Sequence, residues 1–371
     1  MARRAPVIAL LLASSFAFPR AGDREAMVAP PSDSEVAREA AVQAGLTWLA
    51  AQQGPSGAWT GATGHKQEDD YVLFETEAAQ RDRSTGHVGV TSLAGLAFLA
   101  SGHVPGRGRY GDVLDRALDF VLSRRSEFGY VTNGEERMYS HAFAVLFLAQ
   151  VRGMTRTRST EVDDALRSAV AYLQESQNPI GGWRYVPFSK ECDLSVTVCQ
   201  VQALRAARAS GIHVDRSCID RVIGYIRNSR IDGGEYDGCF YYKITGRAAF
   251  TKTSFAINAA AVTALHSAGV YDAREYGPAI TFLENEYLAI QRHYPTHFYF
   301  WYGNYYATQA LHMESEQRFD RWFTRIDADL RARQQSDGRW QNDVGPGDAF
   351  ATAIGCLILR IPDEILPIFQ S

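Results

Sequence analysis

The sequence predicts an all-α protein folded as an α/α toroid, in which a barrel of six inner helices is enclosed by six outer helices. Two observations indicate this fold. First, the spacing Gln-x3-Gly-x-Trp, a QW motif, occurs three times, beginning at Gln53, Gln177 and Gln334. Second, six segments with an apolar pair and a polar end recur roughly every 50 residues, which suits a helical hairpin with its loops.

The middle copy of the motif shows why each copy should end a helix. A helical stretch reaches Gln177 and is followed by Pro179 and by the glycine pair Gly181-Gly182, residues that stop a helix. Trp183 then supplies an aromatic side chain that can fold back over the helix end. Three such stops in one chain indicate repeated units of two helices each.

Each unit pairs a charged helix with a more apolar one. The charged, outer helices are expected near residues 35–53, 110–125, 160–177, 215–230, 273–290 and 317–334. The inner helices follow them, beginning near His87, Met138, Cys192, Lys252, Phe298 and Gly347. A helix that is apolar on most faces is surrounded by protein. An open array would need a polar capping repeat at its end, but Ala349 to Leu359 is apolar, so the units should close into a ring.

The N-terminal segment sets the expected domain organisation. Residues 1–17 combine Arg3 and Arg4 with a short apolar run and small residues, the pattern of a secretory signal peptide. Residues 18–34 read as a linker, and residues 35–371 as one toroid domain. The apolar run is too short to span a bilayer, so we expect a secreted or periplasmic protein without a membrane span. The net charge of −4, with both signs interspersed, gives no indication of a nucleic-acid partner.

Two loops interrupt the helical pattern. The charged loop 61–86 is long enough to be a lid over the toroid or a disordered insert. Residues 235–244 contain a weak strand signal and are expected to form a short hairpin.

Together these features resemble a known fold. The motifs, the six hairpins and the apolar inner helices resemble the toroid of squalene and oxidosqualene cyclases and of protein prenyltransferase β subunits. Gly181–Tyr185, Asp193–Thr197 and Tyr305–Leu311 look similar to bacterial single-toroid proteins of the prenyltransferase/squalene-oxidase repeat group. Because a fold does not settle a function, each implied site has to be examined residue by residue.

The resemblance to cyclases implies an acid at the start of an inner helix. The cyclase pattern Asp-x-Asp-Asp-Thr corresponds here to residues 191–195, so that Asp193 takes the central position and Glu191 the first. Protonating an alkene requires a buried carboxylic acid that keeps its proton. Leu194 replaces the neighbouring carboxylate, and Asp193 is equally suited to cap the following helix. His141, on an inner helix, is either a further catalytic group or a hydrogen-bonded core residue.

The resemblance to prenyltransferases implies a zinc site with one ligand missing. Asp237 and Cys239 match the Asp-x-Cys pair of that family, but Ala351 stands at the position of the third ligand. Zinc requires three protein ligands and an open position, so we predict neither a metal nor another cofactor. Among the five cysteines, Cys192 and Cys239 lie in loops at the same end of adjacent inner helices and are the best candidates for a disulfide.

The stretch from His293 to Tyr306 is unusually rich in aromatic side chains. Such rings can stabilise a carbocation, stack on a sugar or fill a core. The residues expected to bind substrate at the mouth of the barrel are Tyr299, Trp301, Tyr302, Tyr305, Tyr241, Asp237 and Lys252. Arg184, Lys190 and Lys243 lie near the same end, where the N-termini of the inner helices favour anionic groups.

Two classes of function follow from these residues. One is a cyclase-like enzyme, in which Asp193 donates a proton to an apolar polyene and the tyrosines stabilise the cation. The other is a toroid that binds a lipid, glycan or peptide in its aromatic mouth, or that acts on a glycan. The expected partner is therefore a small apolar ligand or a glycan, and the shape of the cavity should separate the two classes.

Overall fold

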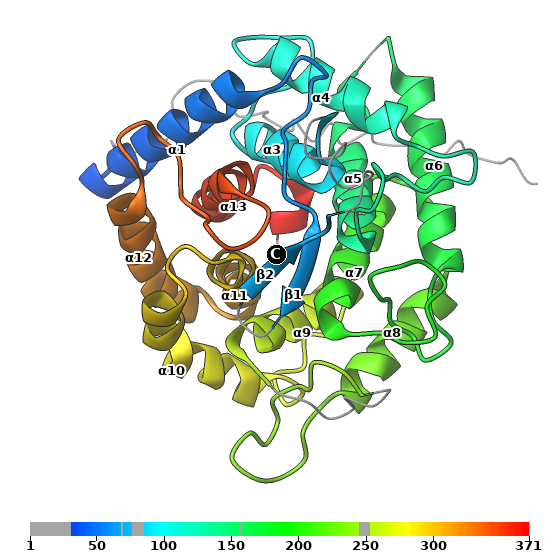
Figure 1. Cartoon of the computed structure of the whole chain (residues 1–371). Helices are drawn as coiled ribbons and strands as arrows, with labels where there is room; N and C mark the ends of the chain where they lie inside the picture. The colour runs from blue at the N-terminus through cyan, green and yellow to red at the C-terminus, as the bar shows by residue number, and fades with distance from the viewer. Residues whose placement is uncertain (1–30, 68–69, 76–84, 156, 245–252, 371) are drawn as a thin grey trace, which may run out of the picture.

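The computed structural model describes residues 31–67, 70–75, 85–155, 157–244 and 253–370, and within these ranges twelve α-helices form two concentric rings (Figure 1). The outer helices are α1 (Asp33–Gln52), α4 (Gly111–Ser123), α6 (Ser159–Glu175), α8 (Arg216–Asn228), α10 (Gly277–His293) and α12 (Glu316–Arg333). The inner helices are α3 (Val88–Ala100), α5 (Met138–Val151), α7 (Leu194–Ala209), α9 (Phe255–Ala268), α11 (Phe298–Glu314) and α13 (Asp348–Arg360). The predicted α/α toroid is confirmed.

The ring closes where the last repeat meets the first. The inner helix α13 contacts α3 and α11 on its two sides and α1 on its outer side. Helix α1 begins at Asp33, two residues inside the predicted linker, because Ser32 and Glu35 form a capping box there. The predicted signal peptide and the linker up to residue 30 lie outside the described residues. Of the helices described, none combines the length and the apolar character needed to cross a bilayer.

Each Gln-x3-Gly-x-Trp motif joins one outer helix to the next in the same way. The glutamine Nε2 donates to the carbonyl oxygen of the motif's own glycine and to a carbonyl oxygen of the following outer helix. These second acceptors are Val113 for Gln53, Cys218 for Gln177 and Ala41 for Gln334, at 2.8, 3.0 and 2.8 Å. The last of these bonds ties α12 to α1, so the motif at Gln334 also closes the ring.

The tryptophan of each motif connects its own outer and inner helices. Its indole Nε1 donates to the carbonyl oxygen of a leucine ten residues earlier, and its backbone amide donates to a threonine hydroxyl on the inner helix. The leucines are Leu49, Leu173 and Leu330, and the threonines are Thr91, Thr197 and Thr352. Because the indole ring is fully buried and its N–H is satisfied, each motif combines a large apolar contribution with no unpaired donor.

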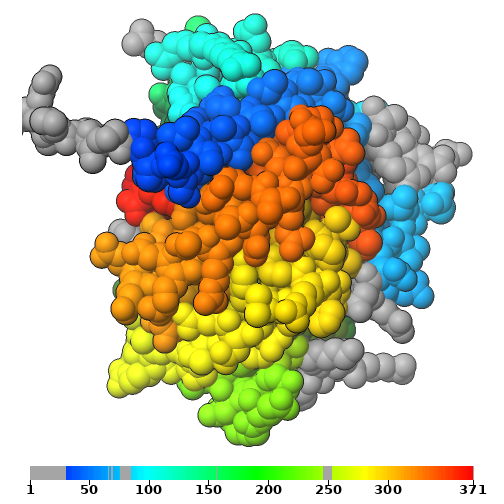
Figure 2. Space-filling view, turned by 90° about the vertical axis from the view of Figure 1, so that its left-hand side faces the viewer, coloured from blue at the N-terminus to red at the C-terminus, as the bar shows by residue number. Residues whose placement is uncertain are grey.

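The two ends of the barrel are covered by different segments. A two-stranded antiparallel hairpin, β1 (Gly64–Gln67) and β2 (Asp70–Leu73), lies across the end formed by the N-termini of the inner helices (Figure 1). At the opposite end, Ile368 and Phe369 are buried and the carbonyl oxygen of Gln370 accepts from Arg205 near the end of α7. Figure 2 shows the hairpin and the C-terminal segment on opposite sides of the ring.

The two loop predictions have different outcomes. Loop 61–86 contains strands within its described part, over the barrel mouth, which agrees with its interpretation as a cover. The predicted hairpin at 235–244 is wrong, because this segment contains turns and isolated bridge residues, among them Phe240, which pairs with Arg230, and no strand. Gly238, at a φ of +76°, packs against Pro278 and turns the chain there.

The axis of the barrel is crossed by contacts between α7 and α11, which are not neighbours in the inner ring. The hydroxyl of Tyr302 donates to the carbonyl oxygen of Ser195 at 2.9 Å. One turn further, Cys199 Sγ and the Tyr306 hydroxyl are 3.0 Å apart. These contacts, together with a 2.6 Å bond between the amides of Gln202 and Gln309, occupy space that a polyene would require. The predicted aromatic-lined chamber is therefore narrowed along its length.

Candidate functional site

Asp193 is the N-cap of α7 and is fully buried. Its Oδ1 accepts from the Val196 amide at 3.0 Å and from the Ser195 hydroxyl at 2.6 Å. Its Oδ2 accepts from the guanidinium of Arg184, which is itself largely buried. All three partners are donors, which is the environment of a carboxylate rather than of a proton-donating acid. Asp193 therefore caps α7, which is one of the two roles predicted from the sequence.

This ion pair belongs to a group of aromatic, charged and polar side chains that we call the mouth cluster: Arg137, Tyr139, Arg184, Tyr185, Asp193, Ser195, Tyr242 and Tyr302. Apart from the fully buried Asp193, these side chains are half-buried. They come from α5, α7 and α11 and from the segments before α5, α7 and α9. Arg184 donates to the Tyr242 hydroxyl at 2.9 Å, and the hydroxyls of Tyr242 and Tyr185 are 2.8 Å apart. The Tyr139 hydroxyl lies 2.6 Å from Ser195 Oγ. A continuous hydrogen-bond network therefore runs across this end of the barrel.

Burial and charge together keep the Tyr242 phenol and the Arg184 guanidinium protonated near neutral pH. Burial and the negative charge of Asp193 raise the pKa of Tyr242 well above its ordinary value, so this phenol remains a donor. Burial acts to lower the pKa of Arg184, but the charge of Asp193 together with Tyr242 and Tyr185 outweighs burial and raises that pKa. Arg184 also lies over the ring of Tyr185, with 4.0 Å from Cζ to the ring centroid. The cluster thus presents phenol hydroxyls and aromatic faces around fixed charges.

Glu191 does not join Asp193 as a catalytic pair. Its carboxylate accepts from Lys243 Nζ at 2.6 Å, and this hydrogen bond is the main cause of its lowered pKa. A general acid needs the opposite shift, because it must hold its proton near neutral pH. Lys243 has a buried side chain whose charge Glu191 balances, so the pair fixes the loop before α9 at the rim of the mouth cluster.

His141 is placed by packing, which argues against its predicted catalytic role. Its Nδ1 accepts from the Val131 amide and its Nε2 lies near the Ala169 carbonyl oxygen, both at 3.1 Å. In the three repeats that contain the tryptophan, the tryptophan backbone amide donates to a threonine hydroxyl on the inner helix. Val131 takes the place of the tryptophan here, and His141 takes the place of the threonine. Burial lowers its pKa to about 4. Both ring nitrogens are engaged with backbone groups, and neither is directed at the mouth cluster.

His141 should make the protein less stable in mild acid. The folded-state pKa is about 4 against 6.5 for an ordinary histidine, so the unfolded chain binds more protons between these values. The stabilisation is complete above pH 6.5 and is lost as the pH falls, by about 2 kcal/mol between pH 7 and pH 5. Urea unfolding of the wild type and of His141→Thr at both pH values tests this. An undiminished pH dependence in the variant would contradict it.

The aromatic residues predicted on α11 face different directions. Tyr302 reaches the mouth cluster, and Tyr299 is half-buried and stacks on His297 with ring centroids 4.7 Å apart. Trp301 is buried and its Nε1 donates to the Gln341 carbonyl oxygen at 3.3 Å, away from the mouth. Tyr305 is buried next to Tyr306 inside the barrel. A helix directs only part of its circumference to one side, so the stretch is divided between the mouth and the core.

Three predicted site residues lie outside the hydrogen-bond network described above or outside the described residues. Asp237 is exposed and accepts from the Gly233 amide at 2.6 Å, which closes a turn. Tyr241 is half-buried in the same loop, and its amide donates to the Ser229 carbonyl oxygen at 2.7 Å. Lys252 lies outside the described residues. Asp237 therefore stabilises the turn in which it lies, and this contact is not with the mouth cluster.

The predicted disulfide between Cys192 and Cys239 is wrong, because all five cysteines are free and buried. Cys192 packs against Gly182 beneath Trp183, and burial raises its pKa to about 11. Burial likewise raises the pKa of Cys239 to about 11. Both thiols act as small core residues. Among the residues described, no three His, Cys, Asp or Glu side chains are grouped closely enough to hold a metal ion.

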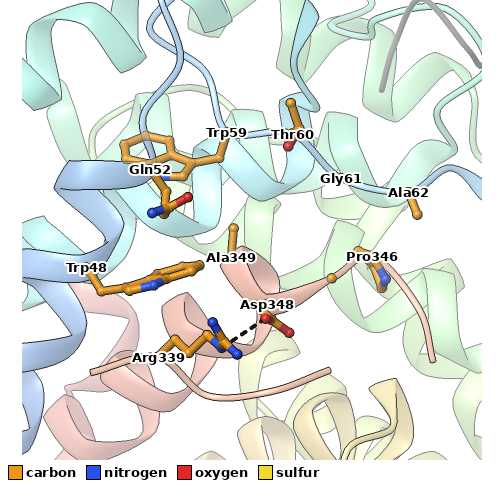
Figure 3. Close-up of a pocket in the computed structure, with 11 residues that line it drawn as sticks. Trp48, Gln52, Trp59, Thr60, Gly61, Ala62, Arg339, Pro346, Asp348 and Ala349 are labelled. Atoms are coloured by element: carbon orange, nitrogen blue, oxygen red, sulfur yellow. Dashed lines mark ion pairs between the residues drawn. The ribbon is translucent and has the colours of Figure 1, made fainter. Parts of the chain in front are cut away.

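A recess lies where the ring closes and is called here the closing-seam pocket (Figure 3). It has a volume of about 630 Å³ and is bounded by α1, by the segment following Trp59 and by the start of α13. Trp48 and Gln52 line it from α1, and Arg339 and Asp348 line it from the last repeat. Arg339 Nε is 3.2 Å from Asp348 Oδ2. Sequence reasoning did not identify this pocket.

Two residues of the mouth cluster were also missed, although the sequence contained a signal for one of them. Arg137 immediately precedes the inner helix α5, as Asp193 precedes α7, and so occupies an equivalent place in the repeat. Aligning the repeats on their inner-helix starts would have found it. Tyr185 has no such signal, because it is positioned by the loop that follows Trp183.

Known proteins share the fold of this chain. No protein-family model matches the sequence, and no curated protein matches it. Type II terpene cyclase MstE from Scytonema, in complex with geranylgeranyl dihydroxybenzoate, is 11% identical with a TM-score of 0.55, covering 90% of this chain and 99% of its own.

Two further solved structures are similar to the same extent. The α-1,6-mannanase GH76A of Salegentibacter sp. HEL1_6, in complex with α-1,6-mannotriose, is 7% identical with a TM-score of 0.58, covering 88% and 98%. A protein from Actinoplanes is 14% identical with a TM-score of 0.55, covering 90% and 100%. At these identities the likeness concerns the fold. The resemblance to the cyclase toroid that the sequence predicts is confirmed at that level.

Proposed function

We propose that this protein is an exported carbohydrate-binding toroid whose mouth cluster binds an acidic glycan. The observation that carries the proposal is the state of Arg137. This guanidinium is half-buried and has no ion-pair partner among the residues that the structure describes. It lies 3.9 Å from the ring centroid of Tyr185 and 5.7 Å from that of Phe74. A cation held between two rings is positioned to receive a carboxylate.

The surroundings of Arg137 suit a sugar acid better than an apolar chain. The phenols of Tyr139, Tyr185 and Tyr242 supply hydroxyl groups within one network, and their rings supply flat apolar faces. Sugars present hydroxyls at their edges and C–H groups on their faces, so they match both features. A polyene would offer no hydrogen-bond acceptor to the half-buried guanidinium of Arg137, which is unfavourable.

We propose binding without hydrolysis, because neither Asp193 nor Glu191 is in the state that a glycosidase requires. Glycoside hydrolysis uses two carboxyl groups that flank the bond, one of them with a raised pKa. Here Asp193 is committed to Arg184, and the pKa of Glu191 is lowered by Lys243. The fold similarity to the α-1,6-mannanase is compatible with a glycan ligand.

Acid-initiated cyclisation is the second candidate, favoured by one observation. Asp193 lies at the start of an inner helix and is linked through Ser195 to Tyr139, which is a possible path for a proton. It would require Asp193 to leave its ion pair with Arg184. Incubation with a geranylgeranyl-bearing aromatic acid, followed by chromatographic separation of the isomers and NMR, tests it. A cyclised product that disappears in Asp193→Asn would overturn the binding proposal.

Calorimetry with uronic-acid oligosaccharides tests the binding proposal directly. The acidic oligosaccharide should bind at least about tenfold more tightly than a neutral one of equal length, because a charge-assisted bidentate pair contributes about 1.5–3 kcal/mol. Arg137→Met should remove this preference. Lys190→Met, at an exposed lysine of the same region, is the matched control and should retain it. Equal binding of both oligosaccharides, or an unaffected Arg137→Met variant, would refute the proposal.

A further inference from the structure

We infer that the closing-seam pocket is a second binding site, which accepts a neutral sugar unit. The pocket is built from the first and last repeats, whereas the mouth cluster is built from other repeats. The inference therefore stands independently of the proposed function, although both concern carbohydrates.

The repeats show that this space is left open at the closing seam. In four repeats a glycine packs on the backbone of the next outer helix, and an aromatic residue follows four positions later on that helix. The glycines are Gly57, Gly129, Gly181 and Gly338, and the aromatic residues are Phe120, Tyr172, Tyr225 and Trp48. These four positions are therefore equivalent, and their surroundings can be compared.

Neighbouring side chains cover the aromatic ring at three of these four seams. Phe120 and Tyr225 are buried, with 2% and 0% of their surface exposed, and lie close to Gly86 and Gly182. Tyr172 stacks on Tyr130 with ring centroids 5.0 Å apart. At the closing seam, Trp48 is only half-buried and borders the pocket instead. The equivalent aromatic side chain is a buried core residue at two of the other seams and is half-buried against Tyr130 at the third, whereas Trp48 presents a face to a recess.

The polar groups of the pocket suit hydroxyl groups. Arg339 Nε is buried and makes no hydrogen bond within the described part of the chain, although Asp348 Oδ2 is only 3.2 Å away. Asp348 Oδ1 accepts from the Asn342 amide at 2.8 Å, which fixes the carboxylate. Figure 3 shows the indole of Trp48 and the amide of Gln52 on one side and the Arg339–Asp348 pair on the other.

The charge and size of the pocket define the ligand class. Arg339 forms ion pairs with both Asp348 and Asp337, so the local charge is not positive and an anionic ligand is not favoured. An adjacent donor and acceptor suit the vicinal hydroxyls of a neutral sugar. A sugar ring can lie against the indole face of Trp48. The volume of about 630 Å³ is within the usual range for small-molecule sites and can hold one or two sugar rings.

Titration with a neutral disaccharide, followed by tryptophan fluorescence and calorimetry, tests the inference. We expect saturable binding that weakens at least about tenfold in Trp48→Ala and in Arg339→Met, and about twofold to threefold in Trp48→Phe, which keeps an aromatic face. Trp48 is half-buried, so its variants should fold, and circular dichroism checks this. Gln335→Ala, at an exposed residue outside the pocket lining, should bind as the wild type does.

The arms of the experiment separate this site from the mouth cluster. Arg137→Met should leave binding of the neutral disaccharide unchanged, whereas it should abolish the preference for acidic oligosaccharides. Disaccharide binding that is lost in Arg137→Met but kept in Trp48→Ala would place the sugar at the mouth and overturn the inference. Absence of binding at millimolar disaccharide would overturn it as well.

Discussion

Replacing Asp193 by alanine should lower the free energy of unfolding by about 3–5 kcal/mol, because it leaves the largely buried guanidinium of Arg184 without its counter-charge. The same change removes the cap on the Val196 amide, which contributes about 1 kcal/mol of that loss. Denaturant unfolding monitored by circular dichroism measures the effect. Asp193→Asn should lie between the two proteins, since its amide oxygen can still accept from Val196.

Asp215→Ala is the matched control for this prediction. Asp215 is also an N-cap, at the start of α8, but it is exposed and its side chain makes no capping bond. Its replacement should change the free energy of unfolding by less than about 0.5 kcal/mol. A loss below about 1 kcal/mol for Asp193→Ala would mean that the ion pair with Arg184 does not stabilise α7, and the argument against a proton-donating Asp193 would fail with it.

Replacing Trp340 by alanine should lower the free energy of unfolding by about 3–5 kcal/mol. Its ring is fully buried and packs between Gly45 of α1 and Gly355 of α13, so its loss opens a cavity where the ring closes. Its Nε1 also donates to the Leu330 carbonyl oxygen at 2.8 Å, which would lose this buried donor and keep only the one from the Gln334 backbone amide. Denaturant unfolding and the melting temperature both report the change.

Two further tryptophan variants calibrate this result. Trp183→Ala removes an equally buried ring from an interior repeat and should have a similar effect. Trp48→Ala removes a half-buried ring beside the closing-seam pocket and should be milder, at about 1 kcal/mol. If Trp340→Ala were no more damaging than Trp48→Ala, the last motif would not be holding α12, α13 and α1 together.

The sequence predicted the helices well because their signals are local and repeated. The outer helix ending at Gln334 was recognised from the same motif that ends those at Gln53 and Gln177, and the boundaries agree within a few residues. The hairpin at 235–244 was predicted wrongly, because aromatic and β-branched residues in a loop resemble a strand. Turns centred on the glycines of that loop decided its structure.

The candidate site was predicted less completely, because side-chain direction depends on neighbours. Asp193 was correctly located as a possible cap, but its ion pair with Arg184 could not be read from the sequence. Trp301 and Tyr302 are adjacent in the chain, yet one faces a loop and the other the mouth. His141 looked like a possible catalytic group and instead takes the place of a threonine that supports the loop before its helix.

The amino-acid sequence by itself determined that this chain forms six helical hairpins and that they close into a ring, because helix stops and apolar faces are properties of short segments. The tertiary structure alone decided what the ring contains. Contacts between α7 and α11 cross the barrel axis, a hairpin covers the mouth, and the closing seam leaves a pocket beside Trp48. Each of these depends on residues more than a hundred positions apart in the chain, whose packing no local pattern specifies.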